Sequence, residues 1–178
     1  MTTDSDQIEG NEGTRMDAVR RFNVLDTPPD GMFDRITALA ARLFDVPIAL
    51  VTIVDHDRIW FKSKFGLDGV DEIGRDPGLC ASAVLQDEPY IVEEARRDPR
   101  TLANPLVAGK FGLQFYAASP LRTAEGARLG TLCIIDRRPR LFSPQQAEIL
   151  QGLSDIVMDE MQLRLSSMRA IADSKRGD

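Results

Sequence analysis

The sequence predicts an α+β domain in which helices pack on a central antiparallel β-sheet. Two pairs of apolar runs indicate hairpins, because each pair is joined by a short polar turn: 48–54 with 59–65, and 115–121 with 129–136. Helical patterns flank these pairs without strict strand–helix–strand alternation, which favours an antiparallel sheet. We expect the terminal helices to share one face of the sheet, and a short helix and a long loop to cover a ligand pocket on the other.

The N-terminal part is predicted to hold a tail and two helices. Residues 1–13 are acidic and carry little apolar surface, so we expect a disordered tail. Thr14 is the expected N-cap of a short helix that ends before the prolines of 27–29. Asp30 caps the next helix, in which apolar residues recur every three or four positions over 33–44.

The middle of the chain is predicted to alternate short elements with loops. Residues 66–76 are rich in Gly and Asp and form a loop, and 77–85 can form a short helix. Residues 89–92 form a short strand whose proline suits a strand start. The loop at 93–112 contains two X-Pro steps, and its length is typical of a lid or binding loop. The acid-Gly turn at 123–126 closes the second hairpin, which we expect at the centre of the sheet.

The last helix is predicted over about 143–172, with Ser143 as N-cap and Pro144 in its first turn. Its apolar face is wider than one sheet contact needs, and at ~45 Å the helix is longer than a small domain. We expect the surplus to pair with the same helix of a second copy. The predicted seam consists of Leu150, Leu153, Val157, Met161, Leu165 and Met168. A second row, which repeats every seven residues, consists of Ile149, Ile156, Leu163 and Ala170. Residues 173–178 are expected to be a flexible tail.

Composition argues against several classes of function. The net charge of −6 is unsuited to sequence-independent binding of nucleic acid. No apolar run approaches ~18 residues and the acidic N-terminus lacks a signal-peptide core, so we expect a cytoplasmic protein without membrane contact. Cys80 and Cys133 are then reduced thiols. The single histidine, His56, sits in a charged turn, which argues against haem ligation and against a zinc site made by protein ligands alone.

Six short pieces of sequence occur in an order that is informative together. They are Leu25-Asp26-Thr27-Pro28-Pro29 with Phe33-Asp34-Arg35-Ile36, Pro47-Ile48-Ala49-Leu50-Val51 with Asp55, Arg58-Ile59-Trp60-Phe61-Lys62-Ser63, Asp98-Pro99-Arg100 with Asn104-Pro105-Leu106-Val107, Phe115-Tyr116-Ala117 with Pro120-Leu121-Arg122, and Gly130-Thr131-Leu132-Cys133 with Ile135-Asp136. With them, residues 17–170 resemble the GAF family of bacterial sensor and signalling domains. The resemblance implies a GAF/PAS-like sheet, a small-molecule pocket over one face, a helical dimer bundle on the other, and regulation of an output domain in cis or in trans.

The candidate pocket residues lie on the predicted sheet strands and on the short helix that covers them. They are Trp60, Cys80, Ser82, Gln114, Phe115, Tyr116, Thr131 and Cys133. Ser82 stands where a histidine is usual in this subgroup, and Gln114 stands where an arginine is usual. The Asn-Lys-Phe-Asp-Glu signature of cyclic-nucleotide-binding relatives is missing, which argues against cAMP or cGMP. Ordinary packing is an open alternative for the aromatic residues, and a small apolar core residue for Cys133.

The expected function is that of a non-catalytic sensor that binds a small molecule and signals through a helical dimer. The chain shows no kinase, cyclase or phosphatase signature and no phosphate-binding glycine loop. Two alternatives stay open. One is a thiol-dependent enzyme of the free methionine sulfoxide reductase type, with Cys80 and Cys133 as catalytic residues. The other is a dimerisation module without a ligand.

Overall fold

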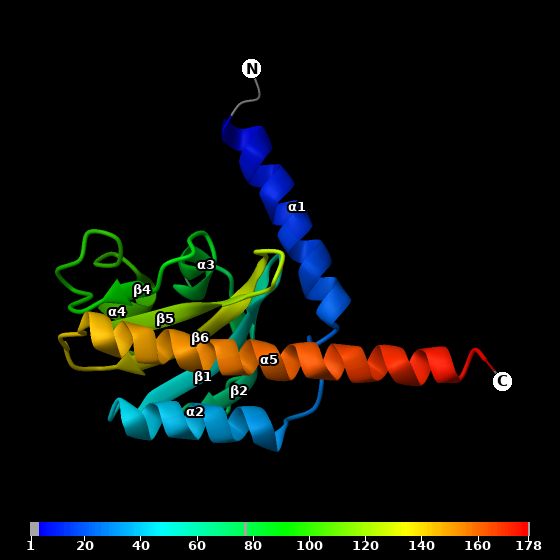
Figure 1. The fold of residues 1–178 in the computed structure, drawn as a ribbon. Coiled ribbons are helices and arrows are strands. Elements are labelled where there is room, and N and C mark those ends of the chain that lie inside the picture. The colour runs from blue at the N-terminus through cyan, green and yellow to red at the C-terminus, as the bar shows by residue number, and fades with distance from the viewer. Residues whose placement is uncertain (1–3, 77, 178) are drawn as a thin grey trace.

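A six-stranded antiparallel sheet forms the centre of the computed structural model, which describes residues 4–76 and 78–177 (Figure 1). Its strands are β1 (Ile48–Val54), β2 (Arg58–Phe65), β3 (Glu72–Gly74), β4 (Tyr90–Val92), β5 (Phe115–Arg122) and β6 (Arg128–Asp136). The order across the sheet is β3-β2-β1-β6-β5-β4. The two predicted hairpins therefore meet through β1 and β6 at the middle of the sheet. The predicted fold class is confirmed, and β3 is an additional strand within the loop expected at 66–76.

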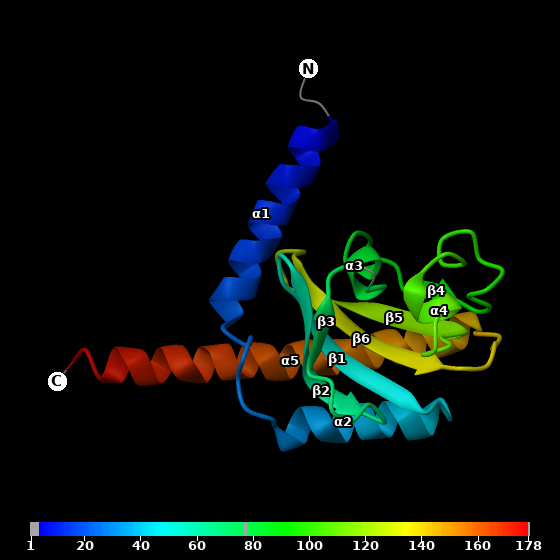
Figure 2. The same ribbon diagram turned by 180° about the vertical axis from the view of Figure 1, so that it is seen from behind.

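Helices pack against both faces of this sheet (Figures 1 and 2). They are α1 (Asp4–Phe22), α2 (Gly31–Leu43), α3 (Cys80–Ala83), α4 (Pro105–Ala108) and α5 (Pro144–Ser174). Side chains of α1, α2 and α5 form one apolar core with one face of the sheet. Side chains of α3, α4 and the neighbouring loops form a second core with the other face. No helix in the described ranges carries an apolar stretch long enough to cross a bilayer.

Helix α1 differs from the prediction at its start. It begins at Asp4, although a disordered tail is expected up to residue 13, and Thr14 lies inside the helix rather than at its N-cap. The apolar face of its second half explains the packing, because Met16, Val19 and Phe22 are buried in the core beneath the sheet. Residues 1–3 of the expected tail lie outside the described residues.

A buried guanidinium fixes α1 to the sheet. Arg15 is only 5% exposed, and its Nη1 donates to the carbonyl oxygens of Val54 at 2.8 Å and of Arg128 at 3.3 Å. Its Nε also donates to the Glu12 carboxylate at 2.8 Å. Buried charges need such partners to offset their desolvation. Helix α1 is therefore tied to the ends of both central strands, β1 and β6.

The caps of α2 and α5 follow the predicted chemistry. The side chain of Asp30 accepts a hydrogen bond from the Met32 amide at the start of α2. At the start of α5, Ser143 Oγ accepts from the Gln146 amide at 3.2 Å, and Gln146 Oε1 accepts from the Ser143 amide at 2.9 Å. This reciprocal pair is a capping box. Helix α5 continues to Ser174, two residues into the predicted tail, and residue 178 lies outside the described residues.

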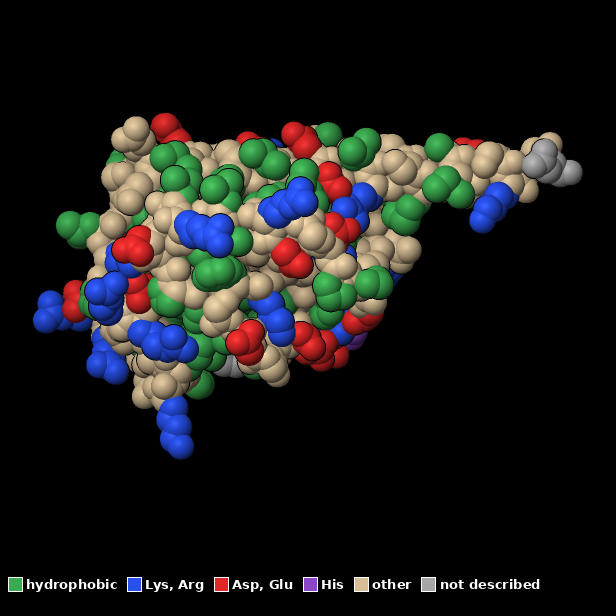
Figure 3. Space-filling model, turned by 90° about the horizontal axis from the view of Figure 1, so that it is seen from below, with side chains coloured by type: hydrophobic (Ala, Val, Ile, Leu, Met, Phe, Trp, Pro, Cys, Tyr) green, Lys and Arg blue, Asp and Glu red, His purple; other side chains and the backbone are tan. Residues whose placement is uncertain are grey.

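The apolar residues of α5 face a different way from that predicted. The structure buries five of the six predicted seam residues against the chain's own sheet: Leu150, Leu153, Val157, Met161 and Leu165. These five residues cannot also contact a second copy, so the predicted seam is wrong. Of its six residues, only Met168 is exposed. The row with seven-residue spacing points to the surface instead, with Ile149, Ile156 and Leu163 between 40% and 62% exposed. Figure 3 shows the molecule from below, with hydrophobic side chains scattered among charged ones over the face in view.

Candidate functional site

Two cysteines meet between α3 and the central strands. Cys133 and Thr131 lie on β6 and Tyr116 on β5, with their side chains on the sheet face that α3 covers, because side chains two residues apart share a face. Helix α3 begins at Cys80 and holds its sulfur over them. Tyr116 Oη donates to Cys80 Sγ at 3.0 Å, and Thr131 Oγ1 donates to the same sulfur at 3.5 Å. The thiol of Cys133 is also near enough to Cys80 to alter its ionisation. We call Cys80, Cys133, Tyr116 and Thr131 the thiol cluster.

The two thiols of this cluster are electrostatically unequal. Hydrogen bonds from Cys133, Thr131 and Tyr116 lower the pKa of Cys80 to about 6, against the opposing effect of burial. The same contact raises the pKa of Cys133 well above its usual value, since a proton on Cys133 stabilises a thiolate on Cys80. Burial and the neighbouring sulfurs also raise the pKa of Tyr116, which therefore stays a hydrogen-bond donor. The contacts therefore favour a thiolate on Cys80 over one on Cys133.

The thiol cluster is enclosed by packed side chains. Cys80 is 5% exposed, and Cys133 and Thr131 are fully buried. The surrounding apolar residues come from α3, β4, α4 and the loops beside them, and include Leu79, Val84, Val92, Val107 and Leu113. Hollows of about 660, 680 and 460 Å³ open on the described surface, and none of these is lined by a member of the thiol cluster. The second face of the sheet is thus a closed core around two sulfurs in this conformation.

The other predicted pocket residues do not gather at the thiol cluster. Phe115 is buried on the opposite face of the sheet, because it neighbours Tyr116 on β5 and adjacent side chains alternate. Trp60 also belongs to the core beneath the sheet, and it lines the 680 Å³ hollow beside β2. Ser82 is half-buried on α3. Gln114 is 7% exposed just before β5, and its side-chain Nε2 has no hydrogen-bond partner among the described residues.

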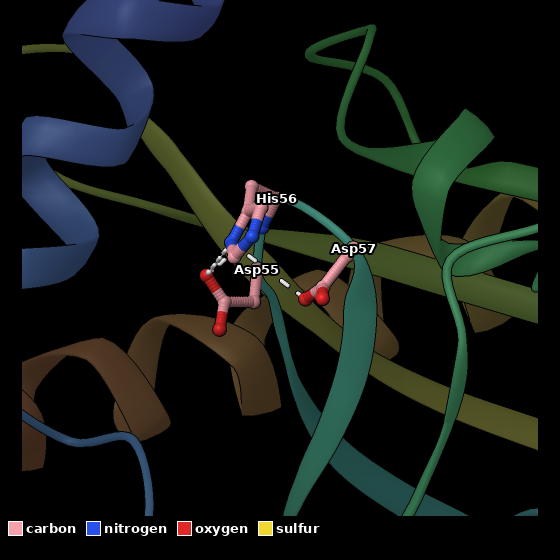
Figure 4. A group of neighbouring side chains, drawn as sticks. All are labelled: Asp55, His56 and Asp57. Carbon is pink, nitrogen blue, oxygen red and sulfur yellow. Dashed lines mark hydrogen bonds and ion pairs between the residues drawn. The ribbon is translucent and has the colours of Figure 1, made fainter.

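The turn between β1 and β2 carries the closest group of possible metal ligands in the described ranges. Asp55, His56 and Asp57 each present one ligand atom, and these atoms lie within 4.8 Å of one another (Figure 4). Asp55 is already engaged, since its carboxylate accepts from the His56 amide at 2.9 Å and from Arg58 Nε at 3.2 Å. These bonds lower the pKa of Asp55 despite partial burial. The geometry is that of a turn held by an ion pair.

A second candidate region was not predicted from the sequence. The hollow of about 660 Å³ lies between α1, the end of α3 and the β5–β6 turn, and it is lined by Glu12, Arg15, Arg75 and Arg128. Its charges are paired: a hydrogen bond from Arg15 and another from Arg75 lower the pKa of Glu12 to about 2, although burial opposes them. The charge pattern of α1 was the only sequence signal for this hollow. It was missed because much of α1 lies in the segment that was expected to be disordered.

A comparison with curated proteins finds a close relative of much greater length. Over 149 residues the chain is 42% identical to a cyclic di-GMP phosphodiesterase of Pseudomonas aeruginosa. The match covers 83% of this chain but 25% of that protein. The chain therefore spans about a quarter of the length of the curated relative.

Solved structures with the same fold include a domain of a phosphotransferase and a sulfoxide reductase. The GAF domain of an Acinetobacter phosphoenolpyruvate-protein phosphotransferase superposes with a TM-score of 0.63 at 16% identity, over 84% of this chain and 93% of that one. A type II free methionine-R-sulfoxide reductase from Thermoplasma acidophilum gives 0.58 at 19% identity, over 72% and 91%. The family model for the GAF domain matches residues 28–161. The chain belongs to the GAF domain family.

Proposed function

We propose that this chain is a non-catalytic GAF module that regulates the turnover of cyclic di-GMP by an output domain. The observation that carries the proposal is the 42% identity with part of a cyclic di-GMP phosphodiesterase. In that relative most of the length lies outside the match, which leaves room for a separate catalytic part. The thiol cluster of this chain holds no group suited to phosphodiester hydrolysis, such as a set of carboxylates around a metal.

The packing of β5 supports a route from the thiol cluster to α5. Tyr116 reaches the thiol cluster from one face of β5, while Ser119 on the same strand points to the other face. The hydroxyl of Ser119 lies 2.8 Å from that of Ser154 on α5, and both residues are about 1% exposed. A displacement of β5 therefore acts directly on the helix that leaves the sheet in Figure 1.

We further propose that the module works as a homodimer in which the exposed row of α5 meets the same row of a second copy. Ile149, Ile156 and Leu163 recur every seven residues along a helix of ~45 Å, a spacing that suits a helix–helix seam. The row continues past the part of α5 that the sheet covers, as Figures 1 and 2 show for the helix. A second copy supplies an identical row, so the contact closes by symmetry.

Sedimentation of the purified chain tests the dimer. The Ile156→Lys, Leu163→Lys variant should be a monomer at concentrations where the wild type is a dimer, because each copy would place lysines in an apolar seam. The matched control, Gln151→Lys with Gln162→Lys, adds the same charge at exposed positions of α5 outside the row and should stay dimeric. A monomeric wild type, or a dimeric Ile156→Lys, Leu163→Lys variant, would overturn this part of the proposal.

A chimaera tests the regulatory function. The matching segment of the Pseudomonas phosphodiesterase is replaced by this chain, and the hydrolysis of cyclic di-GMP is compared with that of the same enzyme lacking the segment. We expect the chimaera to restore the activity level of the intact enzyme, and the Ile156→Lys, Leu163→Lys chimaera to resemble the deletion. A chimaera that cannot be told from the deletion would show that the module does not control this output.

The paired thiols favour one other candidate function, reduction of free methionine sulfoxide. Reductases of that type share the fold, and they need a thiol nucleophile. Against it, Cys80 and Cys133 lie in a closed core with no adjoining hollow among those described. Turnover of free methionine-R-sulfoxide with a thiol reductant decides between the candidates. Activity that both Cys80→Ser and Cys133→Ser abolish would establish the enzyme, and an inactive wild type would remove it.

A further inference from the structure

The thiol cluster contains chemistry that a regulatory fold does not require. Free cysteines in a core are usually inert packing residues, and a single one would carry no argument. Here two of them interact, they come from distant parts of the chain, and two hydroxyls donate to one sulfur. A buried apolar side chain in place of Cys80 would leave the Tyr116 hydroxyl without its acceptor, so the sulfur has a specific polar partner.

We propose that Cys80 and Cys133 form a peroxide-reactive dithiol site that closes to a disulfide within the domain. The Cys80 thiolate attacks one oxygen of hydrogen peroxide, the O–O bond breaks, and the hydroxide that leaves takes up a proton to become water. Cys80 is then a sulfenic acid. The sulfur of Cys133 attacks it, the S–O bond breaks, and the departing hydroxide takes the Cys133 proton. Two thiols and one peroxide thus give one disulfide and two waters.

The geometry assigns a different role to each sulfur. Tyr116 and Thr131 direct their hydroxyls to Cys80, which favours a thiolate there and makes Cys80 the attacking sulfur. Cys133 lies on the central strand β6 and stays protonated until the second step, so it resolves the sulfenic acid. Helix α3 is a single turn with no side-chain cap at its start, which makes it the element of the cover best suited to move aside for a small oxidant.

Closing the disulfide would change the packing over the sheet. The sulfurs must approach to about 2.0 Å, which draws α3 toward β6. Tyr116 Oη then loses the thiolate that accepts its hydrogen bond, and it must shift to find another partner because a buried hydroxyl without one is costly. This shift on β5 reaches α5 through Ser119 and Ser154. The thiol chemistry stands by itself, whereas its use as the input of the module rests on the proposed function.

Oxidation of the reduced, purified chain tests the site. After brief exposure to hydrogen peroxide, the wild type should lose both titratable thiols, and its mass should fall by two hydrogens. A digest under non-reducing conditions should contain the peptides of Cys80 and Cys133 joined to each other. Retention of both thiols while free glutathione is oxidised in the same tube, or disulfides formed only between chains, would overturn the proposal. Because the digest uses the wild type, it tests the disulfide even if a cysteine variant fails to fold.

Variants separate the two roles. In Cys133→Ser the reaction should stop at a sulfenic acid on Cys80, which dimedone captures. Cys80→Ser should react with peroxide about 100-fold more slowly near neutral pH, because the remaining thiol, Cys133, is almost entirely protonated. Ser82→Ala, on the same helix but outside the thiol cluster, should react like the wild type. Equal rates for Cys80→Ser and the wild type would refute the assignment of Cys80. In the chimaera, a change in the rate of cyclic di-GMP hydrolysis on addition of peroxide, abolished by Cys133→Ser, would support the input role. A chimaera that hydrolyses cyclic di-GMP normally but does not respond to peroxide would refute the input role alone.

Discussion

Replacing Tyr116 by phenylalanine removes one hydroxyl and should make the stability of the domain depend differently on pH. The pKa of Cys80 is lowered from 9.0 to about 6 in the folded chain, so between these values the folded state has lost a proton that the unfolded state keeps. The stability that Cys80 contributes is therefore complete above pH 9. It decreases as the pH falls from 9 and is lost as the pH falls through 6. Each pH unit in this window adds at most ~1.4 kcal/mol.

The size of the effect follows from the charge of the acceptor. Below the window Tyr116 Oη donates to a neutral thiol, and its loss costs about 1 kcal/mol; above it the acceptor is a thiolate, and the loss costs about 2–3 kcal/mol. The pKa of Cys80 in Tyr116→Phe should rise by about one accordingly. Cys133 does not interfere with the comparison, because its pKa is raised in the folded state and its titration in the unfolded state is the same for the wild type and the variant.

Urea unfolding with a thiol reductant, at about pH 5.5 and about pH 8.5, measures both quantities. The free energy of unfolding of Tyr116→Phe should be lower than that of the wild type at both pH values. This difference should be at least twice as large at the higher pH as at the lower one. Tyr90→Phe is the matched control, since Tyr90 is a buried neighbour of Tyr116 at 6.1 Å between ring centroids but has no bond to a sulfur. A gap for Tyr116→Phe that is constant with pH would refute the charge on Cys80.

Two further pairs of variants test the packing with the same unfolding assay. Gly130→Ala should lose about 3 kcal/mol, because a Cβ on this central strand would overlap the carbonyl oxygen of Thr52, whereas Gly152→Ala on α5 meets nothing within 4 Å and should gain about 0.5–1 kcal/mol. Equal changes in the pair would contradict the close approach of β1 and β6. Leu150→Ala should cost about 2–5 kcal/mol as a cavity in the core, and Ile149→Ala, its exposed neighbour, less than about 1 kcal/mol in the monomer. The reverse order would mean that the wrong face of α5 has been placed on the sheet.

The central hairpins could be predicted from the sequence because a strand buried on both faces is apolar throughout. The faces of individual side chains were harder to assign. Phe115 and Tyr116 are neighbours on one strand and must point to opposite sides, so only one of them could belong to a pocket. A shift of register between Val51 and Thr52, where β1 pairs with β2, breaks the simple alternation at Lys62, and no residue pattern indicated it.

The two apolar rows of α5 show a different limit. Their spacing indicated two contacts, one with the sheet and one with something else, and the structure confirms that one row packs on the sheet. Spacing alone cannot say which row does so, because both satisfy helical periodicity. The sheet selected the row with Leu150 and Val157, and the closed packing around Cys80 likewise depends on contacts between segments far apart in sequence, which local patterns do not contain.

The buried guanidinium of Arg15 has a practical consequence for anyone who truncates this protein. The family match runs over residues 28–161, yet the packed core extends beyond both ends of that range. Removing α1 would strip the carbonyl oxygens of Val54 and Arg128 of their shared donor and uncover the apolar surface that α1 protects. Ending the chain at residue 161 would remove the buried side chain of Leu165. A fragment cut at the family's borders would expose core and aggregate, and the limits for expression should be chosen from the packing of α1 and α5.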